Sequence, residues 1–70
     1  MEKKNEYEIG DLVMFKPKGR YAKWFGGRLA VIESLSDNGH CRVKWLTPVK
    51  YYDNWATVSD FGLDRFIKHA

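Results

Sequence analysis

Cysteine and long apolar runs are scarce in this sequence. Its 70 residues include one cysteine, Cys41, so an internal disulfide is excluded and the hydrophobic core must supply the stability alone. A lone thiol also fits a reducing compartment better than secretion. No segment approaches the roughly 20 apolar residues of a membrane-spanning helix, and the opening MEKKNEYEIG lacks the apolar centre of a signal peptide. We therefore expect a cytoplasmic protein that does not bind membranes.

Recognisable catalytic and metal-binding patterns are missing as well. No set of Ser, His and Asp, no phosphate-binding glycine loop and no pair of carboxylates stands out. His40, Cys41 and His69 fit no zinc spacing, and a structural zinc site takes four ligands. A chain this short also has little room for a pocket that excludes water. We therefore predict a protein that is not an enzyme and that uses no metal or cofactor.

Aromatic side chains, in contrast, are plentiful. They make up 16% of the residues, within a hydrophobic content of 44%, and each buried ring removes roughly 150–250 Å² from water. This composition is typical of one small globular domain rather than of a disordered segment. We expect residues 1–6 to form a disordered tail and residues 7–70 to form the domain.

Short apolar runs between turn signals predict five strands, at 12–15, 28–34, 40–46, 51–59 and 65–68. The segment 17–27 contains one proline and three glycines and is expected to be a long loop without regular structure. Asn38-Gly39 is typical of a type I′ hairpin turn. Pro48 is expected to end the third strand, and Ser59 to begin one helical turn before the last strand.

Alternation of residue types predicts which side chains of two strands face the core. In the third strand Cys41, Val43 and Trp45 alternate with polar residues and should point inward. In the fourth strand the same alternation places Tyr51 and Trp55 on one face. A curled sheet that closes on itself buries five short strands with few exposed edges. We therefore predict an all-β fold, a five-stranded antiparallel barrel with one short helical turn before the last strand.

This order resembles the SH3-like barrel superfold, in its KOW, Tudor and chromo-barrel branch. The resemblance rests on GDLV at the start of the first strand, Gly27 before RLAVI, the hairpin DNGHCRVKW and the ending SDFGLDRFI. It covers roughly residues 7–68 and extends to short SH3-like proteins of tailed bacteriophages, which implies a host cytoplasm if the protein is viral. The first loop is basic, whereas peptide-binding SH3 domains carry acids there, and Ala30 stands where KOW motifs usually have glycine. Such a superfold hosts many activities, so the resemblance implies a fold rather than a function.

The first loop is the best candidate site, because residues 12–32 carry five cations and no acid. Cations neutralise phosphates and aromatic faces stack on unpaired bases, and Arg42 and Lys44 are expected to extend this surface from the third strand. The proposed nucleic-acid site comprises Lys16, Lys18, Arg20, Tyr21, Lys23, Trp24, Arg28, Arg42 and Lys44. In a plainer interpretation, Trp24 or Phe25 covers the open end of the barrel and the cations are only solvated.

A second set of aromatic residues suggests a cage for a methylated cation, as in Tudor-like barrels. The cage would comprise Trp24, Phe25, Tyr51, Tyr52 and Trp55, with Asp53 as a counter-charge. Ordinary cross-strand packing of the same rings is the alternative.

Two classes of function follow from these patterns. The first is nucleic-acid binding, through the basic-aromatic first loop and the face of the third strand. The second is a protein-interaction module, such as a small phage protein that docks on a host factor or a larger assembly through an exposed aromatic anchor. An acidic protein surface would also suit the basic loop. We take a monomer as the expected state.

Overall fold

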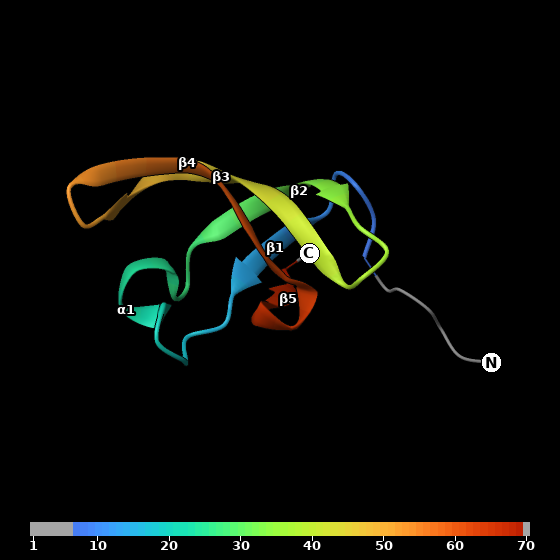
Figure 1. Cartoon of the computed structure of the whole chain (residues 1–70), viewed down its shortest axis with the longest axis horizontal. Coiled ribbons are helices and arrows are strands. Elements are labelled where there is room, and N and C mark those ends of the chain that lie inside the picture. Colours follow the sequence, from blue (N-terminus) through green and yellow to red (C-terminus); the bar gives the residue numbers. More distant parts are fainter. Residues whose placement is uncertain (1–6, 70) are drawn as a thin grey trace.

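Five strands and two single helical turns make up most of the described chain (Figure 1). The computed structural model describes residues 7–69. In chain order the elements are β1 (Leu12–Phe15), α1 (Ala22–Phe25), β2 (Leu29–Leu35), β3 (His40–Tyr51), β4 (Asn54–Gly62), the 3-10 turn η1 (Leu63–Arg65) and β5 (Phe66–Lys68). The predicted all-β class with five antiparallel strands is confirmed. The predicted tail at 1–6 lies outside the described residues.

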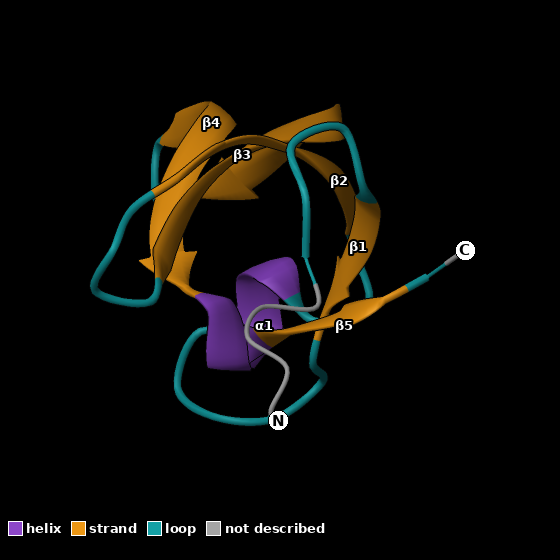
Figure 2. Cartoon of the chain, turned by 90° about the vertical axis from the view of Figure 1, so that its right-hand side faces the viewer, coloured by secondary structure: helices purple, strands orange, loops and turns teal. Residues whose placement is uncertain are grey.

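The strands form one curled sheet in the order β4-β3-β2-β1-β5. Figure 2 shows how the sheet curls over α1, with β5 on the far side of β1. Within residues 7–69 no ladder joins β4 to β5, so the sheet has two edges. The closed barrel therefore stays a prediction.

Inward-facing side chains of the strands and one residue of α1 build the core. Its buried members are Val13, Phe15, Phe25, Ala30, Ile32, Cys41, Val43, Trp45, Val49 and Phe66. Phe15 is central, because its ring contacts Phe61 at 4.9 Å and Phe66 at 5.3 Å between centroids. The alternation predicted for the third strand is confirmed at Cys41, Val43 and Trp45.

The third strand is longer than predicted, since it continues past Pro48 to Tyr51. Pairing with β4 is interrupted between Lys44 and Val49 and then resumes. Pro48 lies inside this irregular segment, where its missing N–H deprives no ladder of a hydrogen bond. The prediction that Pro48 ends the strand was therefore wrong, and β3 and β4 form a long hairpin.

The predicted orientation of the fourth strand was also wrong. Tyr52 and Asp53 are a two-residue turn, so Tyr51 ends β3 and pairs with Asn54, while Lys50 pairs with Trp55. Residues directly opposite each other share a face, so Tyr51 and Trp55 lie on opposite faces of the hairpin. Alternation counted through the turn failed because the chain reverses there.

Both predicted turns differ in detail from those observed. The hairpin between β2 and β3 is present, but only Gly39 has a positive φ, 86°, so the turn is not type I′. The Ser36 N–H donates to His40 O, which leaves a three-residue loop with a left-handed glycine at its end. The helical turn predicted from Ser59 begins at Leu63 instead. Ser59 lies in β4, where its hydroxyl accepts a hydrogen bond from Trp45 Nε1.

Candidate functional site

One helical turn, α1, interrupts the segment that was predicted to lack regular structure. The Phe25 N–H donates to Tyr21 O, and the Gly26 N–H donates to Ala22 O. Gly26 ends the turn at a place where a Cβ would lie 2.6 Å from Ala22 O, so a side chain would not fit there. The glycines that suggested a loop therefore bound a helical turn that is too short for a periodic pattern to reveal.

The turn distributes its side chains between the core and the surface. Phe25 is 3% exposed and stacks on Trp45 with centroids 4.9 Å apart and ring planes at 20°. Trp24 is partly buried and Lys23 is exposed. Successive residues of a helix point in different directions, so this division follows from burying Phe25.

Trp24 meets two tyrosines from the tip of the β3–β4 hairpin. Its ring centroid lies 4.8 Å from that of Tyr51 and 5.0 Å from that of Tyr52. Tyr21 completes the group, with its ring 6.3 Å from both Trp24 and Tyr51. We call Tyr21, Trp24, Tyr51 and Tyr52 the tip cluster. The pKa of Tyr51 is raised above its ordinary value, mainly because its hydroxyl is partly shielded from solvent and, to a smaller extent, because Tyr52 and Tyr21 are close.

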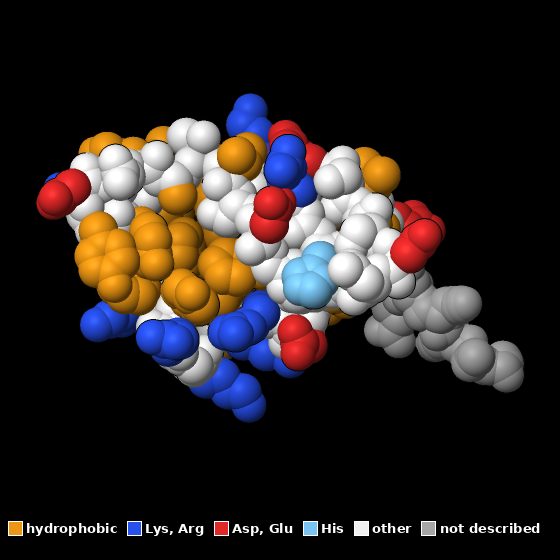
Figure 3. Space-filling view, in the orientation of Figure 1, with side chains coloured by type: hydrophobic (Ala, Val, Ile, Leu, Met, Phe, Trp, Pro, Cys, Tyr) orange, Lys and Arg blue, Asp and Glu red, His pale blue; other side chains and the backbone are white. Residues whose placement is uncertain are grey.

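Cations lie directly on these rings. Lys23 Nζ is 4.7 Å from the Trp24 centroid, and the guanidinium carbons of Arg20 and Arg65 are 6.0 and 5.6 Å from that of Tyr21. These distances are within the range of cation–π attraction. Figure 3 shows hydrophobic side chains gathered at the end of the molecule between the hairpin and α1, with Lys and Arg side chains along the α1 side.

Arg65 is a member of this surface that the sequence analysis missed. It lies in η1, and the Lys16 N–H donates to Arg65 O at 2.8 Å. This bond continues the β1–β5 pairing, in which Phe15 faces Phe66, and brings Arg65 beside the first loop. The register between the first and last strands would have revealed Arg65, but a single sequence does not supply that register.

The loop cations are free of carboxylate partners in the described part of the chain. The two ion pairs there join Arg42 to Asp60 and Lys68 to Asp11. Lys18 and Arg28 are exposed and Lys16 is half-buried. Because no carboxylate neutralises them, all five cations predicted from the loop remain available to an anion.

Arg42 and Lys44 do not join this surface. They alternate with Trp45, which faces the core and stacks on Phe25 of α1, so they lie on the outer face of the sheet. Arg42 donates two hydrogen bonds to Asp60, at 2.9 and 3.3 Å. These bonds raise the pKa of Arg42 and lower the pKa of Asp60. The carboxylate thereby offsets the charge that Arg42 was predicted to offer a phosphate.

The predicted five-residue cage is not assembled. Phe25 is buried in the core, and Trp55 lies on the outer face with Lys50 Nζ 5.5 Å from its ring centroid. Trp24, Tyr51 and Tyr52 do meet, but their centroids are 4.6 to 5.0 Å apart. Rings this close are in direct contact, which leaves no space between them for a methylated ammonium group.

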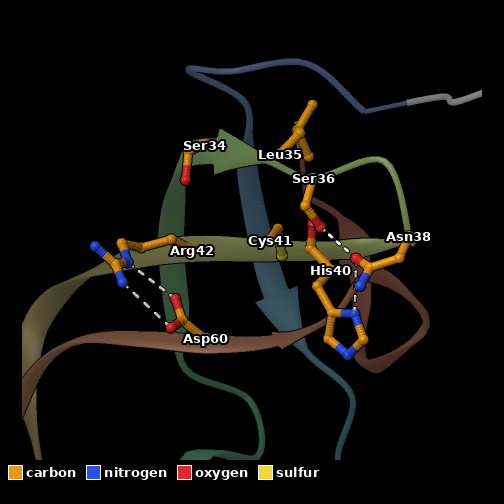
Figure 4. A pocket seen from close by; sticks show the side chains of 8 residues that line it. All are labelled: Ser34, Leu35, Ser36, Asn38, His40, Cys41, Arg42 and Asp60. Carbon is orange, nitrogen blue, oxygen red and sulfur yellow. Dashed lines mark hydrogen bonds and ion pairs between the residues drawn. The ribbon is translucent and has the colours of Figure 1, made fainter.

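An open hollow of about 430 Å³ lies elsewhere, beside the β2–β3 hairpin (Figure 4). In it Ser36, Asn38 and His40 are joined by side-chain hydrogen bonds. Burial, with a smaller contribution from the charge of Asp60, raises the pKa of the Cys41 thiol to about 11. A protonated, buried thiol is a poor nucleophile and a poor metal ligand, so Cys41 contributes no reactive group to this hollow.

The described residues, 7–69, offer neither a metal site nor a helical membrane span. No three His, Cys, Asp or Glu side chains gather there in a way that would hold a metal ion. No helix in the same range is long and apolar enough to cross a membrane. A comparison of the chain with protein-family models, curated proteins and solved structures finds no match. Any function therefore has to follow from the geometry of the chain itself.

Proposed function

We propose that this protein is a small non-catalytic module that binds nucleic acid through the tip cluster and the cations around it. One observation carries the proposal: Arg20, Lys23 and Arg65 lie on partly exposed aromatic rings, and none of them is paired with a carboxylate in the described chain. Phosphates supply the charge that such cations attract, and bases supply flat faces that aromatic rings accept.

The local charge supports a polyanion as the ligand. The formal net charge of the whole chain is only +3, but the five loop cations and Arg65 come from two segments that the Lys16–Arg65 hydrogen bond holds together. Along the chain the nearest acids include Asp64, next to Arg65, and Asp11 and Glu33, each five residues from the nearest loop cation. None of these three forms an ion pair with the loop cations or Arg65 among residues 7–69. A local positive field attracts anions even when the total charge is modest.

We also infer that the curled sheet is an SH3-like barrel of the KOW or Tudor kind, similar to the short proteins of tailed bacteriophages. Five antiparallel strands, a long first loop and a 3-10 turn before the last strand support this inference. Membership in this superfold is compatible with nucleic-acid binding but does not require it.

A salt-dependent binding measurement with two matched variants tests the proposal. Arg20→Gln/Lys23→Gln removes two cations from the tip cluster, and Lys44→Gln/Lys50→Gln removes two cations from the outer face. Binding of labelled oligonucleotides is followed by fluorescence anisotropy over a range of salt concentrations. Each phosphate contact contributes about −0.7 to the slope of log K against log salt for a single strand.

We expect the first variant to reduce that slope by about 1.4 and to weaken binding, while the second variant, with the same net charge, behaves like the wild type. Equal losses in both variants would indicate attraction by net charge alone and would contradict the proposed surface. Absence of salt-sensitive binding by the wild type would exclude nucleic acid as the ligand.

The outer face of the hairpin supports a second candidate function, docking on a protein with an acidic surface. Trp55 and Val58 are 63% and 45% exposed there, beside Lys50 and Lys44. Exposed Trp is a frequent interface anchor, and the lysines would favour acidic residues around it. A protein partner whose binding is lost in Trp55→Thr and retained in Arg20→Gln/Lys23→Gln would support this function.

A further inference from the structure

We propose that Tyr52, at the tip of the β3–β4 hairpin, stacks on an unpaired base, so that the ligand is single-stranded nucleic acid. This inference rests on the proposed function and deepens it, because the charge distribution alone does not distinguish a single strand from a duplex.

The backbone of Tyr52 provides the first argument. It has φ of 57°, in the left-handed region, and is the one residue other than glycine with a positive φ among residues 7–69. Asn, Asp and Gly are the residues usually found where a two-residue hairpin needs this conformation, and a bulky side chain there is an outlier. Strained residues of this kind cluster at functional sites. The fold does not require a tyrosine at this position, so we look for a functional reason for the Tyr52 ring.

The surroundings of the Tyr52 ring provide the second argument. The residue is 64% exposed, and its ring is supported from behind by Tyr51 at 4.6 Å and by Trp24 at 5.0 Å. The plane of the Tyr52 ring is inclined at 67° to that of Tyr51 and at 47° to that of Trp24, so neither neighbouring ring is stacked flat against it. A planar group can therefore stack on Tyr52 without displacing part of the core, and the supporting rings hold the platform in place.

The position of the nearest cation provides the third argument. Lys23 Nζ lies on Trp24, which is the ring adjacent to Tyr52. A base on Tyr52 would place its own backbone within the reach of this flexible ammonium group. Surfaces that bind single strands combine stacking rings with a positively charged path for the backbone. Bases inside a duplex are already stacked and paired, so their faces are not available to a ring on a protruding hairpin.

The test compares three labelled ligands of equal length: a single strand, a duplex and a strand of abasic sugars, which keeps the phosphates and lacks the bases. The proteins are the wild type, Tyr52→Asn, Tyr52→Phe and the control Trp55→Thr, which removes an exposed ring from the outer face. Asn adopts positive φ at little cost, so Tyr52→Asn is expected to remain folded. A heteronuclear NMR spectrum of each variant checks that it is folded.

We expect Tyr52→Asn to weaken single-strand binding about tenfold, a typical loss for one stacked base, and to leave the weaker duplex and abasic binding unchanged. Tyr52→Phe keeps the aromatic face and should bind like the wild type, as should Trp55→Thr. If Tyr52→Asn binds the single strand as tightly as the wild type, or weakens all three ligands equally, the stacking inference is overturned while salt-dependent binding still supports the proposed function. If the wild type binds none of the ligands, the proposed function itself fails.

Discussion

The left-handed backbone of Tyr52 leads to a quantitative prediction about stability. An L-residue other than Gly, Asn or Asp pays roughly 1–2 kcal/mol in this conformation, and the Tyr52 φ of 57° places it there. Replacing Tyr52 by Ala removes the ring and keeps this cost, whereas replacing it by Asn removes the ring and relieves most of the cost. The two variants lose the same ring contacts, so their difference isolates the backbone.

We expect Tyr52→Asn to have a free energy of unfolding about 1 kcal/mol larger than that of Tyr52→Ala. In a domain of this size, 1 kcal/mol corresponds to a melting temperature roughly 4–8 °C higher. Tyr52→Gly should lie between the two, because glycine relieves the strain but its unfolded chain is more flexible, which offsets about 0.4–1 kcal/mol of the gain. The wild type should be close to Tyr52→Asn, since it keeps ring contacts that are worth about 0.5–1.5 kcal/mol when buried and less at the surface.

The assay is urea unfolding followed by tryptophan fluorescence, with thermal unfolding as a second probe. With a slope of roughly 1–3 kcal/mol per molar urea, the midpoints of the Asn and Ala variants should differ by roughly 0.3–1 M. A Tyr52→Ala variant as stable as Tyr52→Asn would refute the reasoning, because it would mean that the backbone at this position carries no left-handed strain.

Three further outcomes follow from the structure. The buried Cys41 thiol, with its pKa raised to about 11, should resist a thiol reagent at pH 8 in the folded protein and react rapidly in urea; equal rates would contradict its burial. The Arg42 hydrogen bond lowers the pKa of Asp60, so the stability from this ion pair is present above the ordinary pKa of 3.8 and is lost as the pH falls below it. The melting temperature of the wild type should therefore fall more steeply on acidification than that of Asp60→Asn, and parallel curves would contradict this. Gly26→Ala would place a Cβ 2.6 Å from Ala22 O and should lower the free energy of unfolding by about 1–3 kcal/mol, as measured by urea unfolding. An unchanged free energy of unfolding would mean that α1 has room to shift.

Short apolar runs, period-two alternation and turn chemistry were enough to predict most of the sheet. They identified the strand at β1, the inward side chains of β3 and the hairpin before it, because each of these features depends on residues close together in the chain. The predicted end of β3 failed at Pro48, where a local irregularity in the pairing accommodates the proline. The tendency of proline to end a strand was therefore overridden by the way β3 and β4 pair on either side of Pro48.

The candidate surface was only partly predictable for a similar reason. Lys23 and Trp24 are neighbours in the chain, so their association was visible in the sequence. Tyr52 was also expected near Trp24, as part of the aromatic cage, and the β3–β4 hairpin places it there. Arg65 was missed, because it reaches the surface through the β1–β5 pairing, a strand register that composition and local spacing do not encode. Trp55 was wrongly grouped with Tyr51 because the position of the turn, which decides the face of every following residue, was not anticipated.

The two interpretations of the first loop, a cover over the core and an anion-binding surface, do not exclude each other, because one helical turn carries the side chains on which both depend. Phe25 must point inward to stack on Trp45, and once it does, the geometry of the turn leaves Lys23 exposed and Trp24 between the two environments. A loss of nucleic-acid binding in a Phe25 variant would therefore say nothing about contact with the ligand, because the same change would displace Trp24 and Lys23. Only substitutions on the exposed side, at Lys23 or at Tyr52, separate the binding surface from the core that supports it.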